Sequence, residues 1–404
     1  AALTGVGLFT PILMLITAFA MMAGAGGAPR AAIAMGQGDK EKAEKILGNC
    51  FTMLMILAVG LTAVFYFACP TLLRWFGASD ATLPYALEYA RIYILGSIFV
   101  LVVMGMNPFV TTQGFAKISM LTTVIGAVIN IVLDPILMFG LGLGVRGAAI
   151  ATVLSQAVSA VWILRFLTGG QTILKLRRRN LRLIPGVILP CLGLGISSFV
   201  MISTESILSV SFTSSLARFG GDVAVGAMTV LTSINQLITM PLSGICQGGQ
   251  PLISYNYGAK KLDRVKEAFF CQFGVCVAYT TVFWAVMMCF PGFFAGIFTN
   301  DAALVDYTAW AIRVFLVCGF SVGFQISCQQ AFMALGQAKI SLVMALLRKV
   351  ILLIPLIFLL PNFFRDKAFA VFLAEPVADI LAAAVTTFLF FRFFRGLMKT
   401  AREE

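Results

Sequence analysis

The stretch FTMLMILAVGLTAVFYFACP, residues 51–70, contains no charged side chain. A helix needs about 20 apolar residues to cross the hydrocarbon core of a bilayer, so this stretch predicts a transmembrane helix. A second run, VILLIPLIFLLP at 350–361, has the same character. Of all residues, 60% are hydrophobic and only 11% are charged, whereas soluble domains carry about a quarter charged residues. The composition therefore excludes a water-soluble protein, because too little polar sequence is left to cover one.

Apolar runs of this kind recur along the whole chain, and they predict an all-α integral membrane protein. We expect spans near residues 5–24, 51–70, 86–106, 118–140, 147–167, 185–210, 224–250, 268–290, 304–333, 340–361 and 367–391. The chain thus has eleven expected transmembrane helices.

The second half of the chain repeats the first at a constant offset of 222 residues. GFAKIS at 114–119 matches GQAKIS at 336–341, and Arg91 matches Arg313. The further matches are Leu15-Ile16-Thr17 with Leu237-Ile238-Thr239, Gly26, Gly27 and Pro29 with Gly248, Gly249 and Pro251, and Tyr85 with Tyr307. A fixed offset indicates duplicated structure. Six expected spans separate the copies, so both face the same way, and parallel repeats of this kind are typical of secondary transporters.

The repeat also predicts how the chain is divided. We expect an N-terminal lobe over 1–168, a basic linker over 169–184 and a C-terminal lobe over 185–404. The helix expected at 185–210 opens the second copy, and its counterpart would lie before residue 1. We therefore expect the first lobe to lack its first helix, so that eleven helices of twelve are present.

The net charge of +12 reflects topology. If the loops alternate sides, the linker and the other loops on its side hold 20 basic residues, whereas the loops on the opposite side hold only 5. The linker alone contributes Lys175, Arg177, Arg178, Arg179 and Arg182, and the opposite side has Arg74, Arg146, Arg218, Arg365 and Lys367. By the positive-inside rule, this bias places the linker and the C-terminus in the cytoplasm, with the protein in the plasma membrane. The basic loops therefore need no nucleic-acid partner.

The chain contains no histidine, and its nine cysteines lie mostly inside apolar runs without a CxxC pair. The absence of histidine excludes His-based zinc sites and His-dependent nucleophilic catalysis. Cysteine within an apolar run behaves as a small hydrophobic residue. These features argue against an enzyme, a disulfide framework and a bound cofactor.

A few ionisable residues fall inside the expected spans, where they are costly and mark functional sites. Asp134 lies four residues after Asn130, so both side chains share one helix face. A carboxylate beside an amide oxygen suits a proton or a sodium ion. The alternative is an Asp at a helix end that reaches water.

Three further acids lie in the second half of the chain. Glu205 is flanked by Thr204 and Ser206, and Glu375 and Asp379 are four residues apart on one face. Glu205 could instead lie at the membrane interface, and the other two could serve packing near a helix start.

Several motifs resemble those of the multidrug and toxic compound extrusion (MATE) family. QGGQPLISYNYGAKKLDRVKEAF at 247–269 resembles the family's eighth-helix signature. Residues 107–135, the TES triplet at 204–206 and AEPVADILAA at 374–383 are similar to bacterial, Firmicute-type members. The resemblance implies two six-helix bundles related by a parallel pseudo-two-fold repeat, the fold of the MOP superfamily. It also implies export of organic cations and drugs in exchange for H⁺ or Na⁺, by alternating access of the two lobes.

The resemblance further assigns site residues. Asn130, Asp134 and Thr152 match the family's N-lobe cation site, where Asp134 would be a ligand if the ion is sodium. The first-helix Asp of that site would precede residue 1. Glu205 matches the seventh-helix Glu of the family. Where some members place a sodium-binding Asp on the tenth helix, this chain has Gln325, Gln329 and Gln330, which argues against a C-lobe sodium site.

We expect a substrate cavity lined by polar side chains and by adaptable Met and aromatic surfaces. The polar candidates are Asn107, Glu205, Gln247, Gln250, Gln329, Glu375 and Asp379. The expected partners are small organic cations and the lipid bilayer, and the protein is expected to be a monomer. The main alternative is a flippase for lipid-linked precursors, which would need a cationic interior, and Arg348 and Lys349 are the clear candidates for it. No selectivity-filter pattern supports a channel.

Overall fold

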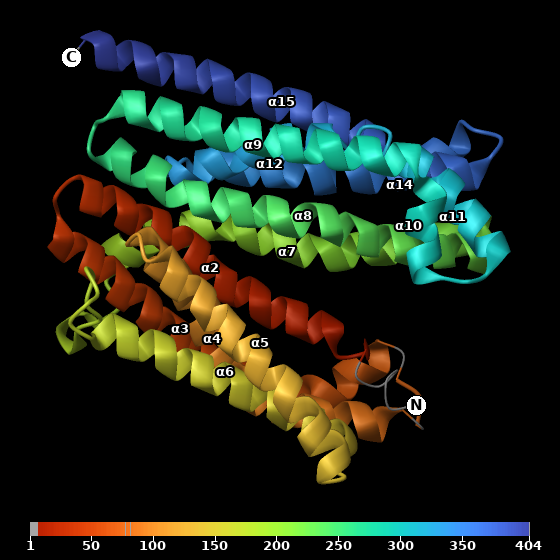
Figure 1. The fold of residues 1–404 in the computed structure, drawn as a ribbon, viewed down its shortest axis with the longest axis horizontal. Coiled ribbons are helices and arrows are strands. Elements are labelled where there is room, and N and C mark those ends of the chain that lie inside the picture. The colour runs from red at the N-terminus through yellow and green to blue at the C-terminus, as the bar shows by residue number, and fades with distance from the viewer. Residues whose placement is uncertain (1–6, 77, 81, 404) are drawn as a thin grey trace. The chain divides into compact units, whose positions relative to one another are not determined.

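The computed structural model describes residues 7–76, 78–80 and 82–403, with side chains described as far as residue 399. All regular elements in these ranges are helical (Figure 1). The predicted all-α fold is therefore confirmed. Residues 5 and 6 of the first expected span lie outside the described residues.

The chain divides into two compact units, Ala1–Ser203 and Thr204–Glu404. The first unit contains α2 (Thr10–Gly36), α3 (Lys40–Trp75), α4 (Leu83–Thr112), α5 (Ala116–Pro135), the π-helix η1 (Ile136–Gly140), α6 (Gly144–Thr168), the 3₁₀ turn η2 (Arg178–Asn180) and the start of α7 (Pro185–Phe219). Within it, α4 packs against α2, α3 and α6, and α5 packs along α6. The core of the unit therefore forms around α4.

The second unit contains the rest of α7 and a similar succession of helices. These are α8 (Gly221–Gly258), α9 (Leu262–Cys289), α10 (Pro291–Phe298), α11 (Ala302–Phe315), α12 (Ser321–Ala334), α13 (Ala338–Leu346), the π-helix η3 (Leu347–Leu353), α14 (Ile354–Leu359), the 3₁₀ turn η4 (Leu360–Asn362) and α15 (Lys367–Glu403). α12 packs against α8, α9 and α15, and α15 also covers η3. This last contact positions the charged residues described below.

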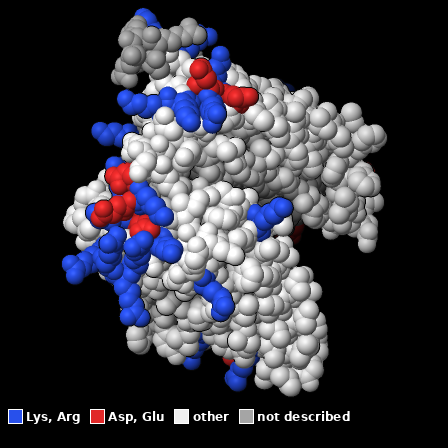
Figure 2. Space-filling model, turned by 60° about the vertical axis from the view of Figure 1, so that its left-hand side comes forward, with Lys and Arg blue, Asp and Glu red and all other residues white. Residues whose placement is uncertain are grey.

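Among the described residues, ten helical segments are long and apolar enough to cross a membrane. They correspond to ten of the expected spans, and Figure 2 shows wide surface areas without any charged residue. The remaining expected span, 304–333, is divided into α11 and α12 by a turn. In this turn Gly319 N bonds to the Leu316 carbonyl at 2.8 Å, an i→i−3 contact that tightens the backbone. The prediction of one continuous helix there was wrong.

The sequence repeat is also present in the backbone. Gly38 (φ 81°) and Lys260 (φ 57°) occupy equivalent positions, as do Gly114 (φ 87°) and Gly336 (φ 71°). Each lies in a tight turn between two helices, where a left-handed residue ends the first helix. The predicted duplication therefore extends to the geometry of the turns.

The linker packs on the N-terminal unit through a buried acid. The Glu44 side chain pairs with Nε of Arg177 at 3.0 Å and accepts a hydrogen bond from the Lys175 backbone at 3.2 Å. Because a buried carboxylate needs such partners, this contact fixes the basic segment to the start of α3.

Two buried amides bind the same segment. Gln113 Oε1 accepts hydrogen bonds of 2.7 Å from the Thr172 hydroxyl and from the Leu174 backbone. Asn49 Oδ1 accepts one of 2.7 Å from the Ile184 backbone. The linker is thus bound along the first unit, and we call it the docked strap. The two compact units meet between residues 203 and 204, inside α7, whereas the sequence repeat begins its second copy at residue 185.

Candidate functional site

The three residues predicted to bind the coupling cation lie together in the N-terminal unit. Asn130 Nδ2 lies 3.4 Å from Asp134 Oδ1 and 3.4 Å from Thr152 Oγ1, both long hydrogen bonds. The Thr152 hydroxyl donates its own proton to the Ala148 carbonyl at 3.0 Å. Its oxygen is therefore an acceptor toward the site. All three side chains are half-buried.

Small residues bring α5 and α6 close enough for this cluster to form. A Cβ on Gly147 would lie 2.7 Å from the Leu137 carbonyl oxygen, and one on Gly126 would lie 2.6 Å from Ser159 Oγ. The Ser159 hydroxyl in turn donates to the Thr122 carbonyl at 3.1 Å. Small residues permit such close approach between membrane helices. Their positions set the distance between Asn130 and Thr152.

The helix changes type directly after Asp134. Pro135 has no backbone N–H to donate, and the π-helix η1 begins at the next residue. Leu141 N bonds to the Ile136 carbonyl at 2.9 Å, the i→i−5 pattern of a π-helix. Such segments are rare and occur frequently at functional sites. The irregular backbone therefore adjoins the carboxylate.

Sequence reasoning missed a fourth residue at this site, Tyr89 of α4. Its side chain lies near Thr152 and Asp134. The ring stacks on Tyr93 with centroids 6.0 Å apart, which holds the hydroxyl in place. The repeat gave no signal for it, because the equivalent residue in the second half is Ala311.

The C-terminal unit contains a second, buried cluster of charges, and it centres on the π-helix η3. Arg348 Nε lies 2.7 Å from Asp379 Oδ1, and Arg348 Nη2 lies 3.1 Å from Glu375 Oε1. The adjacent Lys349 pairs with Glu205 of α7. The acids predicted to line a substrate cavity thus each have a basic partner. The i, i+4 spacing correctly placed Glu375 and Asp379 on one face, but nothing in the sequence linked them to Arg348.

The other predicted cavity residues lie on α4, α8 and α12. Asn107 Nδ2 donates to the Ser119 carbonyl at 3.3 Å and so joins α4 to α5. Gln329, its equivalent in the repeat, is buried in α12. Gln250 is half-buried and Gln247 is exposed on α8. The role of these four side chains in a substrate cavity stays a prediction.

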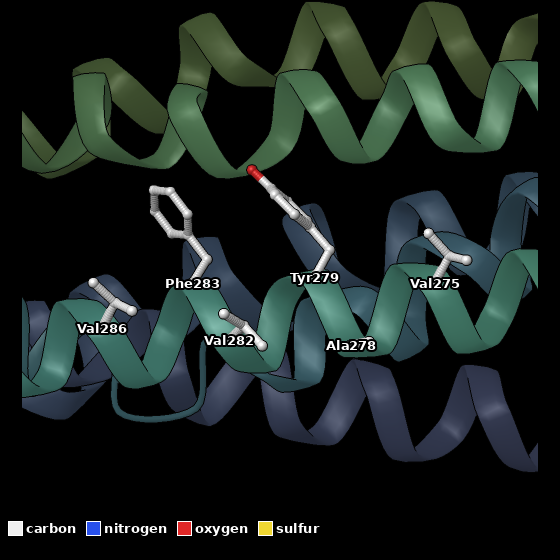
Figure 3. A pocket seen from close by; sticks show the side chains of 6 residues that line it. All are labelled: Val275, Ala278, Tyr279, Val282, Phe283 and Val286. Atoms are coloured by element: carbon white, nitrogen blue, oxygen red, sulfur yellow. The ribbon is translucent and has the colours of Figure 1, made fainter.

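An apolar cavity of about 480 Å³ lies along α9. It is lined by Val275, Ala278, Tyr279, Val282, Phe283 and Val286 (Figure 3). The hydroxyl of Tyr279 donates to the Leu237 carbonyl of α8 at 3.0 Å. The lining contains no Asp, Glu, Lys or Arg, so this cavity offers a mainly apolar surface.

Two helical units with repeated topology, each with an ionisable cluster among apolar helices, define the class of membrane transporters built from internal repeats. The MatE family model matches residues 1–136 and 196–359. The chain therefore belongs to the MatE family.

Individual relatives agree with this assignment. The chain is 24% identical over 389 residues to the multidrug export protein MepA of Staphylococcus saprophyticus, covering 96% of this chain and 86% of that protein. It is 25% identical over 406 residues to a FAD transporter of Shewanella oneidensis, with the same coverage. A crystal structure of MATE in the bent conformation matches with a TM-score of 0.94 and 25% identity, over 99% of this chain and 89% of the other.

Proposed function

We propose that this protein exports organic cations from the cytoplasm in exchange for H⁺ or Na⁺, as a monomer in the plasma membrane. The observation that carries the proposal is the cluster in which Asn130 contacts both Asp134 and Thr152. One carboxylate with a neighbouring amide and hydroxyl provides a single negative charge and oxygen ligands. A monovalent cation balances that charge, whereas the unpaired carboxylate would be costly among apolar helices.

Coupling follows from the position of the cluster. Asn130 and Asp134 belong to α5, Thr152 to α6 and Tyr89 to α4. A cation bound between these helices draws their polar groups together, and its release loosens them. The adjoining π-helix η1 can change its hydrogen-bond register more easily than a regular helix. Ion binding would thereby change the packing of the N-terminal unit and drive alternating access.

Two relatives are named for different substrates, since one is a multidrug export protein and the other a FAD transporter. An anionic dinucleotide, like the pyrophosphate of a lipid-linked precursor, requires available cations. In the described part of the C-terminal unit, Arg348 and Lys349 both contact carboxylates. This pairing favours a cationic substrate over an anionic one or a flippase substrate.

The test is dye efflux from cells that lack their own efflux pumps and express the full chain. We expect Asp134→Asn to reduce efflux of a cationic dye by at least about tenfold, because the neutral amide no longer offers a charge to the coupling ion. Asp80→Asn, which alters an exposed loop acid, is the matched control and should behave as wild type. Wild-type efflux by Asp134→Asn would refute the coupling role. Efflux that stops with a proton uncoupler and ignores Na⁺ would identify H⁺ as the ion.

A further inference from the structure

The ion pair between Glu205 and Lys349 has unequally buried partners. The Lys349 side chain is 6% exposed, whereas the Glu205 side chain is 56% exposed. A cation that approaches this pair from outside the packed helices therefore meets the carboxylate first. The ammonium group contacts the same carboxylate from the interior.

The backbone that carries Lys349 is firmly held. The preceding residue, Arg348, contacts Asp379 and Glu375 of α15 through two different nitrogens of its guanidinium group. Hydrogen bonds between two charged groups are roughly twice as strong as those between neutral groups. Only the flexible side chain of Lys349 can therefore move away from Glu205 without disturbing η3.

The cluster contains more acids than bases. Glu205, Glu375 and Asp379 face Arg348 and Lys349, so three acids share two basic groups. Glu375 belongs to the same cluster, because Arg348, the neighbour of Lys349, contacts it at 3.1 Å. An ammonium group displaced from Glu205 therefore has another acid in the same cluster to turn toward.

We propose that Glu205 is a cation-exchange site, at which Lys349 is a tethered internal cation that the charged group of an organic amine or quaternary ammonium ion displaces. The proposal rests on the proposed function for the identity of the ligand as substrate. In the empty site Lys349 neutralises Glu205, where a bare carboxylate among apolar helices would be unfavourable. In the occupied site the ligand supplies that charge, and Lys349 turns toward Glu375. Lys349 thus competes with the ligand and sets its affinity.

The test measures binding rather than transport, with the purified full chain in detergent. Tetraphenylphosphonium is the probe, because it is permanently charged and carries no acidic proton. We expect Lys349→Met to bind it roughly tenfold more tightly, because the competing internal cation is gone. Glu205→Gln and the double variant should both bind at least roughly tenfold more weakly than wild type.

The control is Lys339→Met, which removes an exposed cation at the start of α13 and should leave the affinity unchanged. Lys349→Arg serves if the Met variant does not fold. It should weaken probe binding, because guanidinium pairs more strongly with a carboxylate. Unchanged or weaker binding by folded Lys349→Met would overturn the proposal. The proposal would also be overturned if Na⁺ binding changed in the Glu205 and Lys349 variants while tetraphenylphosphonium binding did not.

The outcome is separable from the proposed function. Asp134→Asn tests coupling in the other unit, and Lys349→Met should tighten probe binding in that background as well. If Asp134→Asn loses dye efflux while Lys349→Met binds tetraphenylphosphonium with wild-type affinity, the proposed antiport stands. The proposal that Lys349 is a tethered internal cation is then rejected.

Discussion

Asp379 Oδ1 accepts a hydrogen bond of 2.7 Å from Arg348 Nε, and this contact joins α15 to the π-helix η3. Removing one member of a buried ion cluster leaves its partners uncompensated, which typically costs about 3–5 kcal/mol. We therefore expect Arg348→Met to lower the free energy of unfolding by about that amount. Thermal unfolding of the purified protein in detergent measures the effect.

Two variants control this experiment. Arg365→Met removes an exposed arginine in the turn before α15 and should leave stability nearly unchanged. Arg348→Met combined with Glu375→Gln and Asp379→Asn should recover part of the loss, since no buried charge then lacks a partner. A wild-type melting curve for Arg348→Met would contradict the structural role of the cluster.

Thr152→Val tests the hydroxyl at the candidate coupling site. The change keeps the shape of the side chain and removes the acceptor that lies 3.4 Å from Asn130. A lost hydrogen bond of about 1 kcal/mol corresponds to a roughly fivefold weaker half-saturation by the coupling ion. The measurement is efflux rate against Na⁺ concentration or pH. Thr168→Val is the matched control, because its hydroxyl bonds only within α6. Equal shifts in both variants would argue against a site-specific role.

Glu44→Ala tests the docked strap. Without this buried carboxylate, Arg177 and the Lys175 backbone lose a partner, at a cost of about 1–3 kcal/mol. The linker contains several trypsin sites, so we expect the rate of cleavage between residues 175 and 182 to rise by about severalfold. Glu41→Ala removes an exposed pair with Lys45 and should not alter the cleavage rate. Equal protection of the two variants would show that Glu44 does not hold the segment.

Gly26→Ala tests the contact of α2 with the start of α7. An added Cβ would overlap the Cys191 carbonyl oxygen and lie 2.8 Å from Gly195 N, where backbone atoms cannot yield easily. Overpacking of this kind costs about 1–3 kcal/mol. Thermal unfolding should show the loss. Gly60→Ala, with no atom within 4 Å of its new Cβ, should instead be neutral or slightly stabilising. Destabilisation of the same size at Gly60 would remove the packing explanation.

The sequence predicted the helical architecture well, because apolar run length and the 222-residue offset are local or periodic properties. It also placed Asn130 and Asp134 on one face, since i, i+4 spacing determines that relationship in any helix. The turn that divides α11 from α12 was missed. Its tight i→i−3 bonds around Gly319 lie within a continuous apolar run, and nothing in that pattern marks them.

Contacts between distant segments could not be predicted in the same way. Tyr89 approaches Thr152 only because α4 packs on α6, and Lys349 meets Glu205 across a separation of 144 residues. Such pairs depend on helix rotation and on the irregular register of η3. A run of apolar residues contains no information about either. The docking of the linker on Glu44, Asn49 and Gln113 is of the same kind.

The equivalence of α5 with α13 and η3 has an evolutionary consequence. In the first copy this helix carries the acid Asp134, and in the second it carries the bases Arg348 and Lys349. The duplicated halves have kept a common scaffold while acquiring opposite polarity on corresponding helices. Among the described residues, Asp134 has the polar partner Asn130 and no ion pair, whereas Arg348 and Lys349 are supplied with counter-charge by acids of the same unit. A chimera that exchanged these helices would therefore break both arrangements.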